Sequence, residues 1–221
     1  MTANNKSIIF DYRALRLLIG IIAFSLPFVV ILLATPKISS ISASYYTEAR
    51  DAFVGMLFVV GAFLLAYNGH TTRQKIASKI AAFAAVGIAV FPTACDMCSA
   101  SVVPITCLQC ETTYKSVIHF ISAGTLFSIL AYFCLGPFRE KTKRQPGKKG
   151  RRAIIYLVCG VIMLLSMLAA VLSELPPLKE TFKGYDVIFW SELVAMCAFG
   201  VAWIVAGKYL SPLVDAHERL T

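Results

Sequence analysis

Residues 14–34 read ALRLLIGIIAFSLPFVVILLA, and after Arg16 this stretch contains no charged residue. Roughly 20 apolar residues in a helix are needed to cross a hydrocarbon core that is about 30 Å thick. The apolar run is continuous and does not alternate with a period of two residues, so it predicts a transmembrane helix and not a strand of a membrane barrel.

Five further stretches have the same character, and together they account for most of the chain. Hydrophobic residues make up 58% of the 221 residues and charged residues 15%, with a mean hydropathy of +0.73, which excludes an ordinary soluble domain. The sequence therefore predicts an all-α polytopic membrane protein, a single domain over residues 1–221 with six transmembrane helices. The expected spans are residues 14–34, 48–68, 75–92, 116–135, 153–172 and 187–207.

Basic residues are concentrated in alternate loops of this six-span arrangement. The net charge is +9, and one side of the predicted membrane carries sixteen of the 21 Lys and Arg. The other side has Lys37, Arg50, Lys115, Lys179 and Lys183. Because cytoplasmic loops carry the excess of Lys and Arg, both termini are expected in the cytoplasm. This distribution explains the charge without nucleic acid as a partner.

The basic cytoplasmic loop at residues 137–152 has two interpretations. It is either a topology determinant alone, or it also holds anionic lipid headgroups by electrostatic attraction. The third span, by contrast, is rich in small residues, with six alanines and one glycine. Small side chains permit close helix approach in lipid, so this span is expected to lie centrally in the bundle.

Three ionisable residues are predicted to lie about one turn inside the membrane, at one depth near the external side: Asp51, His119 and Glu192. Such residues are costly in lipid and are often functional. They are either helix-end and interfacial residues, or they form an outward-facing pocket for a polar ligand, a lipid headgroup or proton transfer. The expected neighbours of that pocket are Arg50, Tyr45, Tyr46 and Ser122.

Metal binding is restricted by the positions of the three histidines. His70 and His217 are expected on the cytoplasmic side, most of a membrane thickness from His119, so a three-histidine zinc site is excluded by topology. A site formed by His119, Asp51 and Glu192 is not excluded. The sequence names no cofactor.

Four cysteines form two CxxC pairs in the predicted external loop at residues 93–115: Cys95, Cys98, Cys107 and Cys110. Paired CxxC motifs are typical of zinc sites when reduced, but the spacer is short and the external compartment is oxidising. Two structural disulfides are the preferred interpretation, with three possible pairings. A redox-active CxxC remains the functional alternative.

Several segments resemble an uncharacterised family of small bacterial multi-pass membrane proteins. They are ALRLLIGIIAFSLPFVVIL from Ala14, SISASYYTEARDAFVG from Ser40, FPTAC from Phe91, IHFISAGTLFSILAYFCL from Ile118 and FWSELVAMCAFGVAWIVAGK from Phe189. The resemblance implies a bacterial inner-membrane location and carries no reaction. The cysteine-rich insert after Phe91 differs from the usual loop of that family.

Three functions are consistent with these features. The first is a non-enzymatic membrane protein that binds a lipid, a small ligand or a partner through the outward-facing pocket. The second is a membrane thiol–disulfide oxidoreductase that uses the external CxxC pairs. The third is a membrane hydrolase or proton-coupled transporter that uses His119 with a carboxylate.

We expect Cys95, Cys98, Cys107 and Cys110 to be cross-linked with one another, because the external compartment is oxidising. Mass spectrometry of the unreduced, alkylated protein should find no modified thiol at these positions. Four alkylated thiols, or one stoichiometric zinc ion, would contradict the disulfide interpretation.

Overall fold

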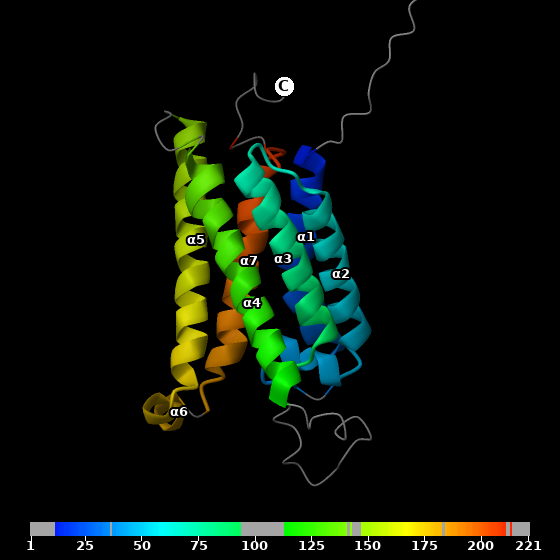
Figure 1. The fold of residues 1–221 in the computed structure, drawn as a ribbon. Helices are drawn as coiled ribbons and strands as arrows, with labels where there is room; N and C mark the ends of the chain where they lie inside the picture. The colour runs from blue at the N-terminus through cyan, green and yellow to red at the C-terminus, as the bar shows by residue number, and fades with distance from the viewer. Residues whose placement is uncertain are drawn as a thin grey trace, which may run out of the picture.

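The computed structural model describes residues 12–35, 37–93, 113–140, 142, 147–182, 184–210 and 213. Within these residues the chain is helical and contains no strand. Long helices run alternately up and down along a common axis, with shorter elements between them (Figure 1). The elements are α1 (Tyr12–Leu33), η1 (Ser42–Tyr46), α2 (Arg50–Ala66), α3 (Thr72–Val90), α4 (Thr113–Phe133), η4 (Cys134–Phe138), α5 (Lys148–Ser173), α6 (Pro176–Phe182) and α7 (Val187–Ala206).

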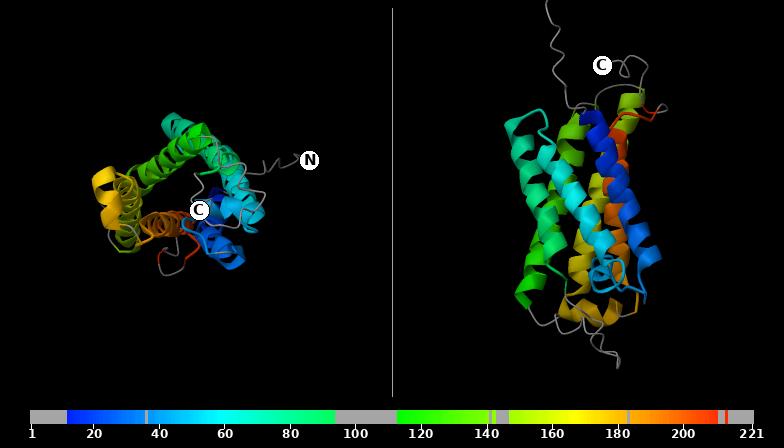
Figure 2. Two further views of the ribbon diagram at one scale, coloured as in Figure 1. Left: turned by 90° about the horizontal axis from the view of Figure 1, so that it is seen from below. Right: turned by 90° about the vertical axis from the view of Figure 1, so that its right-hand side faces the viewer.

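The six long helices form a closed ring. Each packs against its neighbours in the order α1, α2, α3, α4, α5 and α7, and α7 returns to α1. The view along the bundle axis shows this arrangement (Figure 2). The expectation that the third span lies centrally was wrong, because α3 is one member of the ring. Its small residues serve close contacts on both sides: Gly61 of α2 faces the backbone of Ala82, and Gly87 faces Ser122 of α4.

Four of the helices are long and apolar enough to cross a bilayer: α1, α4 continued to Phe138, α5 and α7. All six predicted spans are helices, but α2 and α3 are not both long enough and apolar enough to cross a bilayer. The 17 residues of α2 extend about 26 Å at 1.5 Å per residue, and α3 has Arg73, Lys75 and Lys79 in its first two turns. The chain is therefore that of an α-helical membrane protein with four helices of full spanning length.

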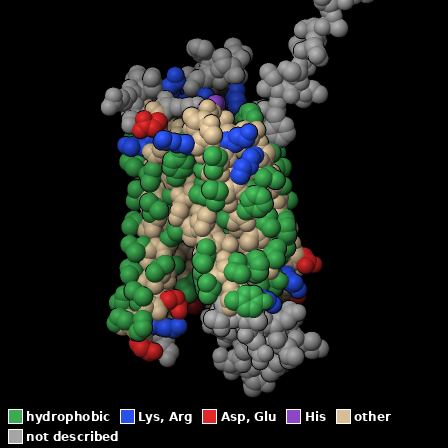
Figure 3. All heavy atoms as spheres, in the orientation of Figure 1, with side chains coloured by type: hydrophobic (Ala, Val, Ile, Leu, Met, Phe, Trp, Pro, Cys, Tyr) green, Lys and Arg blue, Asp and Glu red, His purple; other side chains and the backbone are tan. Residues whose placement is uncertain are grey.

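The outer surface of the ring is apolar. Large hydrophobic side chains point away from the bundle on several helices, including Leu32, which is 84% exposed, and Phe83, which is 70% exposed. Hydrophobic atoms cover much of the visible surface between the two ends (Figure 3). In water such a surface would be an unusually large apolar patch, whereas in a membrane it is in contact with the apolar lipid chains.

Charged side chains are segregated to the two ends. One end, which we call the basic end, holds eleven of the fifteen described Lys and Arg, and Glu140 is the one described carboxylate there (Figure 3). The other end, which we call the mixed-charge end, holds four Lys and Arg together with six described Asp and Glu. The basic-end residues are Arg13, Arg16, Arg73, Lys75, Lys79, Arg139, Lys148, Lys149, Arg151, Arg152 and Lys208.

Two glycines close the ring where α1 meets α7. A methyl group added at Gly20 would lie 2.5 Å from the main-chain nitrogen of Ile204 and 2.8 Å from the carbonyl oxygen of Gly200. A methyl group at Gly200 would lie 2.7 Å from the main-chain nitrogen of Phe24. Because backbone atoms cannot move aside as a flexible side chain can, these two positions require glycine for the helices to approach so closely.

We expect Gly200→Ala to lower the free energy of unfolding by about 1–3 kcal/mol, as overpacking of a close interface does. The measurement is a denaturant titration of the purified protein in mixed micelles. Gly55→Ala is the matched control, because no atom outside the neighbouring backbone of α2 lies within 4 Å of the methyl group that it adds. Equal stability of the two variants would show that the contact between α1 and α7 is not as tight as described.

Candidate functional site

Glu192 lies in the second turn of α7 and binds the loop that precedes α2. Its two carboxylate oxygens accept hydrogen bonds from Ser42, one from the main-chain nitrogen at 3.1 Å and one from Oγ at 2.8 Å. The loop is itself packed into the bundle, since Ile38 and Ile41 are 4% and 1% exposed. Glu192 therefore fastens η1 to α7 at the mixed-charge end.

His119 makes a second cross-link at the same end. It is 2% exposed, and its Nδ1 lies 2.8 Å from the carbonyl oxygen of Phe91, the residue that follows α3. A carbonyl oxygen can only accept, so Nδ1 carries the hydrogen. The last carbonyl groups of a helix lack partners within the helix. His119 thus satisfies one of them and joins α4 to α3.

The predicted neighbours of these residues also make local contacts. The guanidinium of Arg50 donates to Tyr45 Oη at 3.1 Å and lies 4.6 Å from the centre of that ring. Tyr46 Oη donates to the carbonyl oxygen of Thr93 at 2.7 Å. Ser122 packs against Gly87 of α3, and Asp51 is exposed in the first turn of α2.

These contacts bring Arg50 together with Tyr45, but they do not join Asp51, His119 and Glu192 to one another. The described residues contain no group of three His, Cys, Asp or Glu side chains that could hold a metal ion. The structure thus gives no support to the metal site that the sequence left open. Convergence of the three residues on one ligand pocket stays a prediction, as does the interfacial interpretation. Cys95, Cys98, Cys107 and Cys110 lie outside the described residues.

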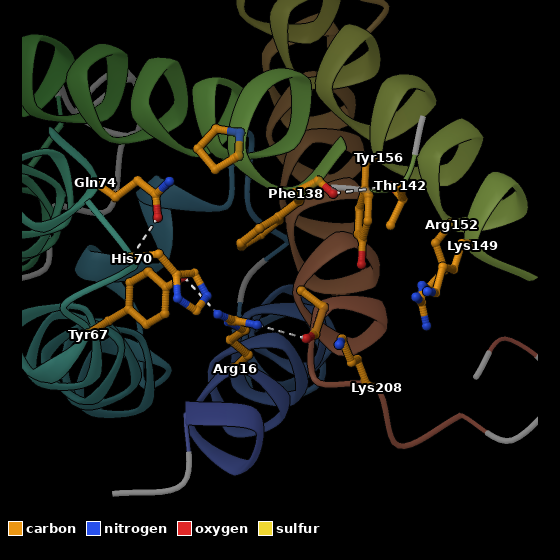
Figure 4. A pocket seen from close by; sticks show the side chains of 12 residues that line it. Arg16, Tyr67, His70, Gln74, Phe138, Thr142, Lys149, Arg152, Tyr156 and Lys208 are labelled. Atoms are coloured by element: carbon orange, nitrogen blue, oxygen red, sulfur yellow. Dashed lines mark hydrogen bonds between the residues drawn. The ribbon is translucent and has the colours of Figure 1, made fainter. Parts of the chain in front are cut away.

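A cavity of about 100 Å³ lies at the opposite, basic end of the bundle. Four basic side chains from α1, α5 and the residues after α7 line it: Arg16, Lys149, Arg152 and Lys208. The described lining residues include no Asp or Glu. The side chains enter the space from different sides, with Arg16 opposite Lys149 and Arg152 (Figure 4).

The wall between α2 and α3 is formed by a tight turn. Gly69 has a φ of +60°, which suits a residue without Cβ, and Thr71 Oγ1 accepts from the main-chain nitrogen of Gln74 to begin α3. In return Gln74 Oε1 accepts from the main-chain nitrogen of His70 at 2.8 Å. These bonds fix His70 and Gln74, which both line the cavity.

The opposite wall depends on a π-helical turn at the end of α4. Pro137 lies within η4 and has no main-chain hydrogen to donate, so a regular α-helix cannot continue through it. The wider turn places Pro137 and Phe138 on the cavity wall. Thr142 Oγ1 then donates to the carbonyl oxygen of Phe138 at 3.2 Å. Short π-helical segments are often found at functional sites.

Arg16 is held in place by neutral groups. It donates to the carbonyl oxygen of Ala206 at 3.3 Å and to Tyr67 Oη at 3.1 Å, and its guanidinium lies 5.3 Å from the centre of the Tyr67 ring. Its Nε is buried and has no hydrogen-bond partner within the described part of the chain. Arg16 therefore keeps both its positive charge and one unused donor.

Arg152 is the most buried charge of the cavity, at 1% exposed. Its Nη1 donates to the carbonyl oxygen of Leu213 at 3.0 Å. An aromatic cluster lies beside the cavity, with the ring of Trp203 5.4 Å from that of Tyr67 and 5.5 Å from that of Phe138. The cavity thus combines fixed positive charges with a rigid apolar wall.

Sequence reasoning missed this cavity because it treated the basic residues as loop charges that set topology. Two signals could have found it. Arg16 lies one turn inside the first helix, where a purely topological charge is not needed. Pro137 lies at the end of a predicted span next to the basic loop, where a break in the helix was to be expected.

Comparison with known protein families, with curated proteins and with solved structures finds no match to this chain. The resemblance to a family of small bacterial membrane proteins therefore stays a prediction.

We expect Ser42→Ala and Glu192→Gln each to lower the free energy of unfolding by about 1–3 kcal/mol. Each change weakens the hydrogen bonds between Ser42 and the Glu192 carboxylate and leaves a polar group without its partner. The double variant should be less destabilised than the sum of the two changes, since both remove the same contact. Chemical unfolding in micelles provides the measurement. Asp51→Asn is the control and should change stability by less than about 0.5 kcal/mol, because Asp51 is exposed. Additive effects of the two single changes would contradict a direct bond between Ser42 and Glu192.

Proposed function

We propose that the protein is a non-enzymatic, six-span inner-membrane protein that binds anionic lipid headgroups at its basic, cytoplasmic end. The observation that carries the proposal is the charge segregation. Eleven described Lys and Arg share the basic end with one described carboxylate, whereas four described Lys and Arg share the mixed-charge end with six Asp and Glu. Positive charge next to a membrane surface attracts anionic lipids by about 1 kcal/mol per residue.

The six-span arrangement is supported by the ring. Helices α2 and α3 lie side by side between α1 and α4, which have full spanning length. A shorter helix within such a bundle is accommodated by local thinning of the bilayer and by Lys and Arg that extend toward the headgroups. Lys79 on α3 extends in this way, since its Nζ donates to Asn68 Oδ1 at 3.3 Å near the basic end.

The orientation follows from the same charges. The beginnings of α1, α3 and α5 and the ends of α2, α4 and α7 lie together at the basic end (Figure 1). The positive-inside rule places this end in the cytoplasm, with both termini. An inner membrane is the expected location on that basis and on the family resemblance.

The alternative functions gain less support from the described residues. The thiol–disulfide exchange hypothesis depends on cysteines outside the described part of the chain. The hydrolase or transporter hypothesis needs His119 next to a carboxylate, whereas its described partner is the carbonyl group of Phe91. The outward-facing pocket likewise depends on His119 and Glu192, whose described hydrogen bonds go to Phe91 and Ser42.

Impermeant maleimide labelling tests the orientation. We expect Tyr185→Cys, at a position 70% exposed at the mixed-charge end, to be labelled from outside on intact spheroplasts beyond the level of the parent chain. Arg73→Cys, exposed at the basic end, should be labelled only after the membrane is opened. The reverse pattern would place the basic end outside and overturn the proposal.

Lipid analysis of the purified protein tests the binding. Phosphatidylglycerol should be enriched over phosphatidylethanolamine relative to the membrane extract, and the enrichment should fall as salt is raised. The variant with Arg73→Gln and Lys75→Gln should retain less phosphatidylglycerol because it carries two fewer exposed positive charges at that end. Retention in membrane proportions at every salt concentration would contradict lipid binding by charge.

A further inference from the structure

The basic end contains a cavity as well as a charged surface, and the two have different chemistry. Surface charges such as Arg151 attract anions at long range without selecting one. The cavity instead presents Arg16, Lys149, Arg152 and Lys208 around one space of about 100 Å³. A water molecule needs roughly 10–15 Å³ of such space, so the cavity has room for a group of several heavy atoms.

We propose that this cavity is a specific binding site for one phosphate group. The proposal deepens the function proposed above by naming a defined site and ligand chemistry at the basic end. The phosphate belongs either to a lipid headgroup or to free phosphate, since both present the same oxygens to the cavity.

The donors in the cavity match the oxygens of a phosphate. Guanidinium groups bind phosphate with two parallel hydrogen bonds, and Lys supplies a compact charge. Two guanidinium groups, Arg16 and Arg152, come from α1 and α5, the two helices that pack on either side of α7. Tyr156 also lines the space. A tetrahedral anion with several acceptors can use donors from several directions, whereas a planar carboxylate uses fewer of them.

The charge of the cavity favours an anion. An anion placed among positively charged side chains is attracted to each of them, most strongly where water is restricted. Arg16 has only neutral partners in the described part of the chain, and its Nε retains a buried hydrogen without an acceptor. Leaving such a donor without an acceptor costs about 1–3 kcal/mol, so a bound oxyanion would stabilise this arrangement.

The position of the cavity is suited to a membrane-surface ligand. It lies where α1 and α5 begin and where α4 and α7 end, at the level of the basic surface. The guanidinium of Arg16 lies 5.3 Å and 5.6 Å from the centres of the Tyr67 and Phe138 rings, and both rings pack against Trp203. A preformed set of donors binds an anion without paying for its own ordering.

The test measures the effect of two probes on the thermal unfolding of the full-length protein in micelles. The probes are inorganic phosphate and dihexanoyl phosphatidylglycerol, each at constant ionic strength, with dihexanoyl phosphatidylcholine as the zwitterionic control. Ligands that bind the folded state raise the midpoint with a concentration dependence that gives a dissociation constant. Trp203, next to the cavity wall, reports unfolding by its fluorescence in a Trp190→Phe background.

Two neighbouring arginines provide a matched comparison. Arg152→Gln removes a charge that is 1% exposed in the cavity, and Arg151→Gln removes the same charge from the exposed side of α5. We expect Arg152→Gln to weaken binding by about tenfold or more, which is the loss of one charged hydrogen bond. Arg151→Gln should bind nearly as the parent chain does. If Arg152→Gln fails to fold, Lys149→Gln and Lys148→Gln give the same comparison, because only Lys149 lines the cavity.

Each outcome decides the proposal. Stabilisation by inorganic phosphate that is lost in Arg152→Gln, or in Lys149→Gln, supports a site for free phosphate. The same pattern with dihexanoyl phosphatidylglycerol alone supports a site for a lipid headgroup. Equal effects within each variant pair, or no stabilisation by either probe, would overturn the site. Loss of lipid enrichment in the Arg73 and Lys75 variant would still support the proposed function in that case, so the two failures are distinguishable.

Discussion

A lipid environment offers no water to main-chain N–H and C=O groups, and this constraint organises the molecule. Each long segment forms a helix, in which the main-chain N–H and C=O groups are hydrogen-bonded to each other. The helices pack in a ring with apolar side chains outside. Polar groups that have no hydrogen-bond partner within a helix are bound by other residues at the two ends of the bundle. The carboxylate of Glu192 binds the main chain and hydroxyl of Ser42, and the ring of His119 binds the carbonyl of Phe91.

The two ends of the bundle differ in how their polar side chains are used. At the mixed-charge end, polar side chains are used in short-range bonds that hold loops against helices, as Tyr46 does with Thr93. At the basic end, arginines bind carbonyl groups at and just after the end of α7: Arg16 donates to Ala206, and Arg13 donates to Lys208 at 3.2 Å. Positive charge at a helix C-terminus is favourable to the helix dipole. These arginines therefore have a structural role, and their remaining charge surrounds the cavity.

The sequence predicted the helices well because continuous apolar runs are a strong signal. All six expected spans are helices, and the end of residues 187–207 differs from α7 by one residue. Spanning length was harder to predict for α2 and α3, because the charges of α3 lie within its first two turns and the loop before α2 folds into the bundle. The site was harder still. A shared depth of Asp51, His119 and Glu192 follows from the sequence, but the bonding partners depend on which helices are neighbours. Likewise Arg16 and Arg152 are 136 residues apart, and only closure of the ring brings them to one cavity.

The contact between Gly20 and Gly200 also has a consequence for how the protein is made. The two partners are separated by 180 residues, so α1 enters the membrane long before α7 exists. At about 5–20 residues per second, translation leaves α1 without this neighbour for on the order of 10–40 s. During that interval its glycine-bearing face meets lipid or other helices. The last helix to be synthesised is the one that completes the ring, and cellular factors that shield membrane helices during biogenesis would act on α1 in this period.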